Sequence, residues 1–205
     1  IMTIAAGYPL SKRDFRGRGG ITFLFTLTMF FSGGMVPNFL LIKNLDMYNS
    51  IWALLLPGCV SAWNLVIMRT YFQTSIPEEI CESAYIDGCS NISTLLRIVL
   101  PLSMPIIAVM VIFYGVGHWN SYFSALLYLK DRDKYPLSLV LREILLQGMG
   151  QEKSGAEVVD SVADLLLFET LKYAVIIVSS VPMLTLYPAL QRYFVKGTMV
   201  GSLKG

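Results

Sequence analysis

The sequence predicts an all-α protein, built as a polytopic bundle of helices that cross a membrane. Its 205 residues are 55% hydrophobic and only 15% charged, and its mean hydropathy is +0.60. Because a soluble domain carries about 25% charged residues, this composition disfavours a disordered chain and a soluble enzyme. The net charge of +2 is too small to favour a polyanionic partner, so no nucleic acid is expected.

Long stretches without a charged residue are the second observation. A bilayer core about 30 Å thick needs about 20 apolar residues in a helix. The predicted spans are residues 21–42, 47–68, 98–129 and 173–191, and the third has residues to spare. The chain opens at Ile1 on what reads as the end of an apolar helix, IMTIAAGYPL, so we expect one or more N-terminal helices to be missing.

Small and polar residues inside these stretches are the third observation. Gly33-Gly34, Pro57-Gly58 and Pro105 all lie within predicted spans. Small residues let helices approach closely, and proline or polar residues in lipid need protein or water beside them. We therefore expect one packed bundle over residues 1–205. The small and polar residues inside the spans either line a transport pathway or only pack the helices together.

Alternating crossings assign the loops to two faces of the membrane. Residues 11–20, 69–97 and the tail from Arg192 share one face, while residues 43–46 and 130–172 share the other. The first loop, SKRDFRGRGG, holds four cationic side chains, and short loops rich in Lys and Arg lie in the cytoplasm. This predicts a cytoplasmic segment 69–97 and an extracellular loop 130–169.

The stretch from residue 75 to residue 101, here called the elbow, is predicted to form a helix, a tight turn and a second helix. Ser75 and Glu78 match a capping box, and Gly88 suits the left-handed residue that ends a helix. Ser90 or Asn91 caps the second helix. The first helix carries an apolar stripe of Ile76, Ile80, Cys81 and Ala84. A stiff cytoplasmic hairpin of this kind suits docking to another protein. A simple connection between two spans would not need to be rigid, because a flexible linker would serve equally well.

The spacing of the elbow resembles a known motif. Glu82-Ser83-Ala84, three residues, Gly88, nine residues and Ile98-x-Leu100-Pro101 are similar to the EAA loop of the membrane subunits of binding-protein-dependent ABC importers. Asp87 fits too, and Ser83 stands where the family usually has a second alanine. The likeness covers nearly the whole chain, including GHWNSYFSALLYL and YPALQRYFVKGTMVGSLKG, and is strongest to carbohydrate permeases of the MalG and LplC type.

That resemblance implies the fold and the role of the chain. The fold would be that of a type I importer permease, multi-pass in the bacterial inner membrane, forming half of a pathway for oligosaccharides or polysaccharide fragments. The partners would be a second homologous permease, two cytoplasmic ATPase subunits, an extracellular solute-binding protein and a sugar. ATP and Mg²⁺ would bind the ATPase subunits, with no cofactor on this chain. The residues implied in ATPase coupling are Glu82, Ser83, Ala84, Asp87 and Gly88.

The sequence offers no signature of an enzyme. It has no P-loop and no zinc-protease or hydrolase motif, and its three cysteines form no C-x-x-C pair. Catalysis and metal binding are therefore not expected. His118 is either a proton relay or substrate contact, or a neutral packing residue.

Aromatic and amide side chains within the spans are candidates for contact with a sugar. These are Trp119, Asn120, Tyr122, Asn64 and Asn38, with Trp63 nearby. Each is equally a residue of helix packing or of an interfacial belt. In loop 130–169, the residues Leu139, Leu141, Ile144 and Leu145 predict an amphipathic surface helix, which either docks the solute-binding protein or is solvated.

Two other functions are also compatible with the sequence. One is an ABC permease for a solute that is not a sugar. The other is a membrane scaffold that transports nothing and recruits a cytoplasmic partner through the elbow.

Overall fold

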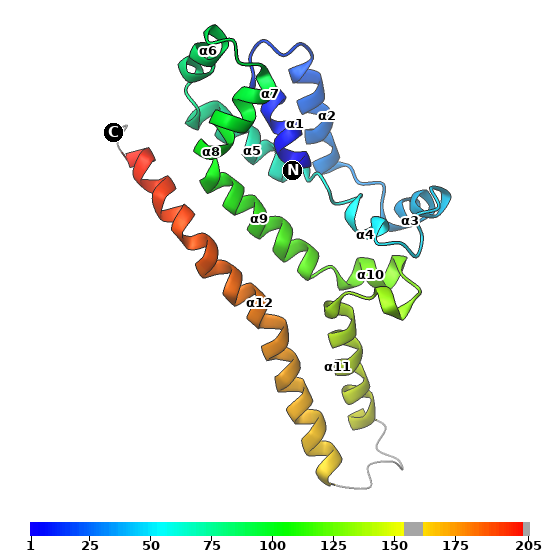
Figure 1. Cartoon of the computed structure of the whole chain (residues 1–205). Helices are drawn as coiled ribbons and strands as arrows, with labels where there is room; N and C mark the ends of the chain where they lie inside the picture. The colour runs from blue at the N-terminus through cyan, green and yellow to red at the C-terminus, as the bar shows by residue number, and fades with distance from the viewer. Residues whose placement is uncertain (154–161, 203–205) are drawn as a thin grey trace. The chain divides into compact units, whose positions relative to one another are not determined.

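In a computed structural model, the described part of the chain, residues 1–153 and 162–202, consists of helices joined by loops and turns, without a strand (Figure 1). The predicted all-α class is confirmed. The longer elements are α1 (Met2–Ser11), α2 (Arg18–Phe30), α3 (Met35–Asn44), α5 (Ala62–Ser75), α6 (Glu78–Ile86), α9 (Met104–Trp119), α11 (Leu137–Lys153) and α12 (Val162–Ser202). The short ones are α4 (Trp52–Leu55), α7 (Asn91–Thr94), the π-helical η1 (Leu95–Val99), α8 (Leu100–Leu102), α10 (Tyr122–Tyr128) and the 3₁₀ turn η2 (Arg132–Lys134).

Contacts divide the chain into two compact units. The first contains Ile1–Leu41, Leu55–Val111 and the chain from Tyr193 onwards, and the second contains Ile42–Leu54 and Ile112–Arg192. The elbow belongs wholly to the first unit. The α10–α11 segment belongs wholly to the second. The prediction of one membrane domain stays a prediction.

The core of the first unit is the packing of α1 against α5. A Cβ added to Gly7 would lie 3.2 Å from Cγ of Met68, so the small residue lets the two helices approach closely. The Met68 side chain is completely buried. Tyr8 meets Phe72 edge to face with ring centroids 6.1 Å apart. Carbonyl oxygens at the end of α1, which have no partner within the helix, accept hydrogen bonds from α5: Arg69 Nε donates to Leu10 (3.0 Å).

Two of the predicted spans are interrupted near glycine. Residues 21–42 form α2 and α3, bent by 119° at a short break. Gly34 there adopts φ +87°, which glycine reaches without steric cost. Residues 47–68 are also divided, because α4 ends at Leu55, α5 begins at Ala62, and Pro57-Gly58 lies between them.

A third predicted span, residues 98–129, bends by 84° where residues Asn91–Leu102 meet α9. Pro105 is the second residue of α9, a position where its missing N–H costs nothing. A second break at Asn120 and Ser121 separates α9 from α10. Three of the four predicted spans are therefore not continuous helices. Among the described residues one helix, Glu169–Pro188, is long and apolar enough to cross a membrane, or three if each bent pair is one span.

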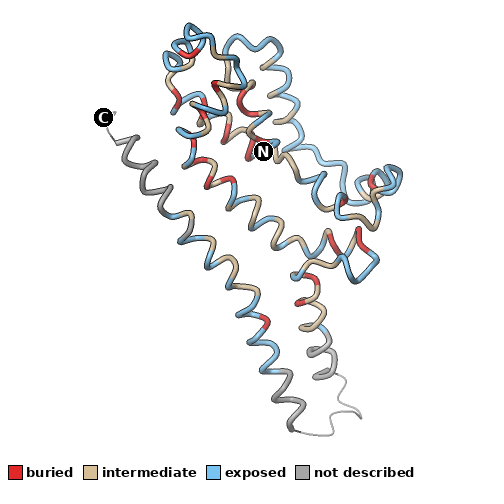
Figure 2. Tube along the Cα trace, viewed as in Figure 1, coloured by how far each residue is buried: buried red, intermediate tan, exposed pale blue. Residues whose placement is uncertain are grey.

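The predicted helix at residues 173–191 is confirmed and is longer than expected. α12 runs from Val162 to Ser202 and contains Pro182 and Pro188, so residues 162–169 are helical where a loop was predicted. Only 6% of the Glu169–Pro188 window is buried, and Figure 2 shows this stretch as mostly exposed. Because an exposed helix of such apolar composition is unsuited to water, this surface needs lipid or a neighbouring protein.

In the second unit, α10 packs against α11. Ala125, Leu129 and Leu139 form a buried cluster, with Leu54 and Tyr135 against it. A helix over Leu139–Leu145 is confirmed within α11, where Leu139 is 1% exposed and Leu141 8%. Its predicted amphipathic surface character stays a prediction. The helix continues to Lys153. Residues 154–161 of the predicted extracellular loop lie outside the described residues.

Candidate functional site

The turn of the elbow is held by backbone hydrogen bonds. The Cys89 N–H donates to the Ala84 carbonyl (2.9 Å), and the Gly88 N–H donates to the Tyr85 carbonyl (3.0 Å). Gly88 has φ +78°. These features form a Schellman motif, which satisfies the last carbonyls of α6. No heavy atom lies within 4 Å of a Cβ added at Gly88, so the turn requires glycine for its backbone conformation and not for space.

The second half of the elbow is helical from Asn91 to Leu102. Ser90 caps it, with its Oγ accepting a hydrogen bond from the Ser93 N–H (3.3 Å), as predicted. The predicted capping box is wrong. Ser75 is the last residue of α5, and α6 has Pro77 at its N-cap without a side-chain cap. A proline disfavours the helical conformation of the residue before it, so Ile76 becomes the break (φ −103°, ψ 110°) and Ser75 stays in the preceding helix.

The predicted coupling residues separate into an inner and an outer set. Ala84 is 4% exposed, whereas Glu82, Ser83, Asp87 and Gly88 are exposed. Of the predicted apolar stripe, Ile76 is also buried, Cys81 is half-buried and Ile80 is at 36% exposure. The inner set therefore anchors α6. In the outer set, Ser83 Oγ donates to the Glu79 carbonyl (2.8 Å), and the carboxylates of Glu82 and Asp87 are exposed.

An exposed apolar surface lies at the tip of the elbow. Tyr85 is 77% exposed, Ile86 85% and Ile92 70%. Large apolar side chains exposed together beside polar ones are typical of a protein–protein docking site. These three residues were not predicted from the sequence, although the place of Tyr85 and Ile86 outside the apolar stripe of α6 was a usable signal. We call them the tip surface.

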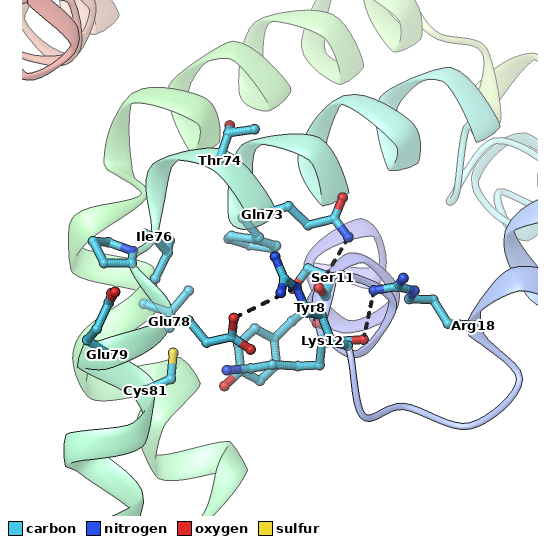
Figure 3. Close-up of a pocket in the computed structure, with 14 residues that line it drawn as sticks. Tyr8, Ser11, Lys12, Arg18, Gln73, Thr74, Ile76, Glu78, Glu79 and Cys81 are labelled. Carbon is cyan, nitrogen blue, oxygen red and sulfur yellow. Dashed lines mark hydrogen bonds and ion pairs between the residues drawn. The ribbon is translucent and has the colours of Figure 1, made fainter. Parts of the chain in front are cut away.

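A cavity of about 510 Å³ lies at the foot of the elbow (Figure 3). Its walls come from the end of α1, the loop after it, the end of α5 and the start of α6. Arg13 Nε lies 3.8 Å from Glu78 Oε2, and Arg18 Nη1 donates to the Lys12 carbonyl (3.4 Å). The cationic first loop and the elbow are thus neighbours in one unit, which agrees with the prediction that both lie on one face of the membrane.

Lys12 closes one side of this cavity. Its Nζ lies 5.3 Å from the ring centroid of Tyr8. Partial burial opposes the charge, but the Cys81 side chain and the Tyr8 hydroxyl outweigh that effect and raise the pKa of Lys12. Lys12 therefore stays charged at neutral pH, with α1 on one side of it and α6 on the other.

Comparison with known proteins now identifies the family. The family described as binding-protein-dependent transport system inner membrane component matches residues 2–200. The chain belongs to this family. The predicted resemblance to permeases of binding-protein-dependent importers is thereby confirmed, and the chain is a membrane component of a transport system.

Relatives of known name support the same family. The chain is 44% identical to the polygalacturonan/rhamnogalacturonan transport system permease protein YtcP of Bacillus subtilis, over 97% of this chain and 68% of that protein. It is 42% identical to protein LplC of the same organism, over 99% of this chain and 68% of that protein. A solved bacterial ABC transporter involved in the import of the acidic polysaccharide alginate matches with a TM-score of 0.80 and 31% identity, over 93% of this chain and 67% of that chain. The structure therefore has the fold of an ABC importer permease.

The predicted pathway residues of this permease fall into two groups. Asn38, exposed in α3, and Asn64, 7% exposed in α5, belong to the first unit. Trp119, Asn120 and Tyr122 lie together in the second unit, where α9 gives way to α10. Trp119 Nε1 donates to the Ser179 carbonyl (3.0 Å), and Asn120 Nδ2 donates to the Val116 carbonyl (3.0 Å). The role of all five residues in a pathway stays a prediction.

A polar cluster in the second unit was not foreseen from the sequence. Asn49 has φ +60°, and its Oδ1 accepts hydrogen bonds from the backbone N–H groups of Lys130 (3.0 Å) and Asp131 (3.1 Å). Its Nδ2 donates to Asp131 Oδ2 (2.8 Å). Lys134 Nζ donates to the Asn49 carbonyl and to Asp131 Oδ2, both at 2.9 Å. We call Asn49, Lys130, Asp131 and Lys134 the Asn49 clasp.

Charges within the clasp favour an ionised Asp131. The hydrogen bond from Asn49 and then the one from Lys134 lower the pKa of the Asp131 carboxyl. In the described part of the chain, no group of three or more His, Cys, Asp and Glu side chains is placed to hold a metal ion. The clasp is accordingly a structural lock between distant segments.

Proposed function

We propose that this chain is the membrane-spanning permease subunit of an ATP-driven importer for oligosaccharides or polysaccharide fragments. It would cross the membrane several times and form half of the translocation pathway with a second permease. The observation that carries the proposal is the elbow, a backbone-locked turn that presents the exposed tip surface, in a chain that matches a transport family over residues 2–200. Family membership supports transport over a scaffold without transport activity.

The elbow fits a mechanical role. The Schellman turn fixes the angle between α6 and the helical stretch Asn91–Leu102, which leads into α9. When two ATPase subunits close on ATP and Mg²⁺, a partner docked on Tyr85, Ile86 and Ile92 would move the elbow as a rigid body. A stiff turn transmits that displacement into the membrane, whereas a flexible one would absorb it.

The proposed substrate class follows from the named relatives. Both the polygalacturonan/rhamnogalacturonan permease and the alginate importer handle carbohydrates. An extracellular solute-binding protein would deliver the sugar, and Trp119, Asn120 and Tyr122 supply aromatic and amide groups suited to sugar rings and hydroxyls. A permease for another type of solute remains the second candidate.

The test exploits the left-handed backbone at Gly88. Gly88→Val places a β-branched residue at φ +78°, which costs about 1–2 kcal/mol. Gly88→Asn is the matched control, because asparagine tolerates this conformation. We expect Gly88→Val to lower both oligosaccharide uptake and ATP hydrolysis stimulated by the loaded binding protein about tenfold in the assembled complex, and Gly88→Asn to keep most of both.

The result also separates the alternatives. Unchanged uptake in Gly88→Val, with the subunit inserted at normal levels, would contradict the coupling role. Stimulation of ATP hydrolysis by a non-sugar solute and by no oligosaccharide would favour the second candidate. A complex without any ATP-dependent uptake would favour the scaffold.

A further inference from the structure

Two arginines of the second unit have different surroundings. Arg132, on the turn η2, lies 3.5 Å from Glu143 Oε2. Arg142, on α11, lies over the ring of Tyr122, with its Cζ 4.8 Å from the ring centroid. Among the described side chains, no carboxylate lies within ion-pair distance of Arg142. Arg132 thus has a carboxylate partner, and Arg142 has only an aromatic face.

The stacked arrangement leaves the guanidinium of Arg142 suited to an anion. Arg142 is half-buried, and a charge removed in part from water is stabilised by an opposite charge and by hydrogen bonds. A guanidinium whose face is covered by an aromatic ring still presents N–H donors at its edge, in a fork that matches a carboxylate. The edge of the Arg142 guanidinium can therefore bind an anion such as a carboxylate.

The position of Arg142 is fixed by the packing of α10 and α11. Leu139, one turn earlier on α11, is 1% exposed, and Ala125, one turn after Tyr122 on α10, is completely buried. Both belong to one buried cluster. The two side chains that meet, Tyr122 and Arg142, are therefore held by rigid helices, which is what a specific binding site requires.

The neighbours of this pair suit a sugar. Tyr122 is 38% exposed and follows Trp119 and Asn120 at the junction of α9 and α10. An aromatic ring offers a face to the apolar side of a pyranose. The Asn120 amide nitrogen already donates to the Val116 carbonyl, so the amide oxygen is the group offered to a hydroxyl, and the guanidinium offers two donors to a carboxylate. A neutral sugar uses the first two groups only, whereas a uronate uses all three.

We infer that Arg142, placed by Tyr122, recognises the carboxylate of a uronate-containing oligosaccharide and so selects acidic over neutral sugars. The inference rests on the proposed function and narrows its substrate class. It agrees with the named relatives for polygalacturonan/rhamnogalacturonan and for the acidic polysaccharide alginate.

The experiment measures binding to the purified importer, assembled with its second permease and ATPases but without the solute-binding protein. The probes are trigalacturonate and its fully methyl-esterified form, which has the same sugar rings and no charge. We expect Arg142→Gln to weaken trigalacturonate binding about tenfold, the loss of a charge-assisted hydrogen-bonded pair, and to leave binding of the ester unchanged. Arg142→Lys should be intermediate, because it keeps the charge and loses the fork.

Arg132→Gln is the matched control, since this arginine already pairs with Glu143. It should change the Kd of neither probe. The inference is overturned if the unsubstituted importer does not prefer trigalacturonate to the ester. It is also overturned if Arg142→Gln weakens both probes equally or neither, as expected of a purely structural arginine.

A separate measurement keeps the two proposals apart. ATP-dependent oligosaccharide import by the complete assembly tests the proposed function. If the assembly imports oligosaccharide but the ratio of the Kd of trigalacturonate to the Kd of its ester is the same in Arg142→Gln as in the unsubstituted protein, the proposed function stands and the inference is overturned. If the unsubstituted assembly imports no oligosaccharide, both fall.

Discussion

The elbow and the Asn49 clasp each contain a residue with a left-handed backbone, and they stabilise it in different ways. At Gly88 (φ +78°), backbone hydrogen bonds hold the turn, from Cys89 to Ala84 and from Gly88 to Tyr85. At Asn49 (φ +60°), the side chain itself makes three of the hydrogen bonds. The turn of the elbow therefore uses no side-chain hydrogen bond at its left-handed residue, whereas the clasp uses its side chains internally.

This difference suits the elbow to the docking proposed for it, and the clasp to joining distant segments. A docking surface needs a fixed backbone and unoccupied side chains, which the tip surface of Tyr85, Ile86 and Ile92 provides. A lock needs side chains that join segments distant in the sequence, and the clasp joins residues 82 positions apart. Substitutions at the two left-handed residues should therefore have opposite outcomes.

Exchanging the two residues gives the largest expected contrast. Asn49→Gly keeps the backbone conformation but removes the side-chain hydrogen bonds, each worth about 1 kcal/mol. We expect amide hydrogen exchange at Lys130 and Asp131, whose N–H groups donate to Asn49, to accelerate about tenfold or more. Gly88→Asn should leave exchange at Gly88 and Cys89 within about twofold, because the backbone bonds there need no side chain.

The comparison fails if exchange at Lys130 and Asp131 is unchanged in Asn49→Gly, since the clasp would then be held by something else. The comparison is also contradicted if Gly88→Asn accelerates amide exchange in the elbow as strongly as Asn49→Gly accelerates it in the clasp.

A smaller effect is expected from pH. The hydrogen bonds from Asn49 and Lys134 lower the pKa of the Asp131 carboxyl, so ionised Asp131 stabilises the folded clasp. That contribution is fully present above the ordinary carboxyl pKa of about 3.9 and is lost as the pH falls through the lowered value. We expect protection of the clasp amides, corrected for intrinsic exchange, to be constant from neutral pH to about pH 4 and to weaken below it.

Asp131→Asn is the control for this titration and should show no such acid-dependent step. The elbow, whose turn contains only backbone bonds, should show none in either protein. Equal acid sensitivity of the elbow and the clasp would contradict the difference drawn between them.

Features set by nearby residues were predictable from the sequence. Gly88 and Ser90 each act within five positions of the chain, and the structure places both as expected. At Ser75 two local effects compete. The Ser75–Glu78 pattern favours a capping box, but Pro77 keeps Ile76 out of the helical conformation, so the helix boundary moves and the capping box does not form. The break around Pro57-Gly58 likewise interrupts a stretch that hydropathy alone marks as continuous.

Features set by distant residues were not predictable. Asn49 gives no sequence signal beyond being a residue type that tolerates positive φ, because its partners follow a long intervening segment. The pairing of Tyr122 with Arg142 depends on α10 packing against α11, which periodicity does not reveal. The predicted pathway residues Asn38 and Asn64 belong to another unit than Trp119, and only the fold shows that.

The tip surface is proposed to dock on a separate ATPase subunit in the cytoplasm. This docking is tested by Ile86→Cys in a chain whose Cys59, Cys81 and Cys89 are replaced by serine, assembled into the importer and treated with a thiol-directed photo-cross-linker. Phe23→Cys, on the exposed apolar side of α2 (Phe23, 64% exposed), is the matched control. We expect a cross-link from position 86 to the ATPase subunit, none from position 23, and no reaction of position 86 with an impermeant maleimide added to intact cells. Labelling of position 86 from outside the cell, or the absence of its cross-link in an active complex, would contradict the claim.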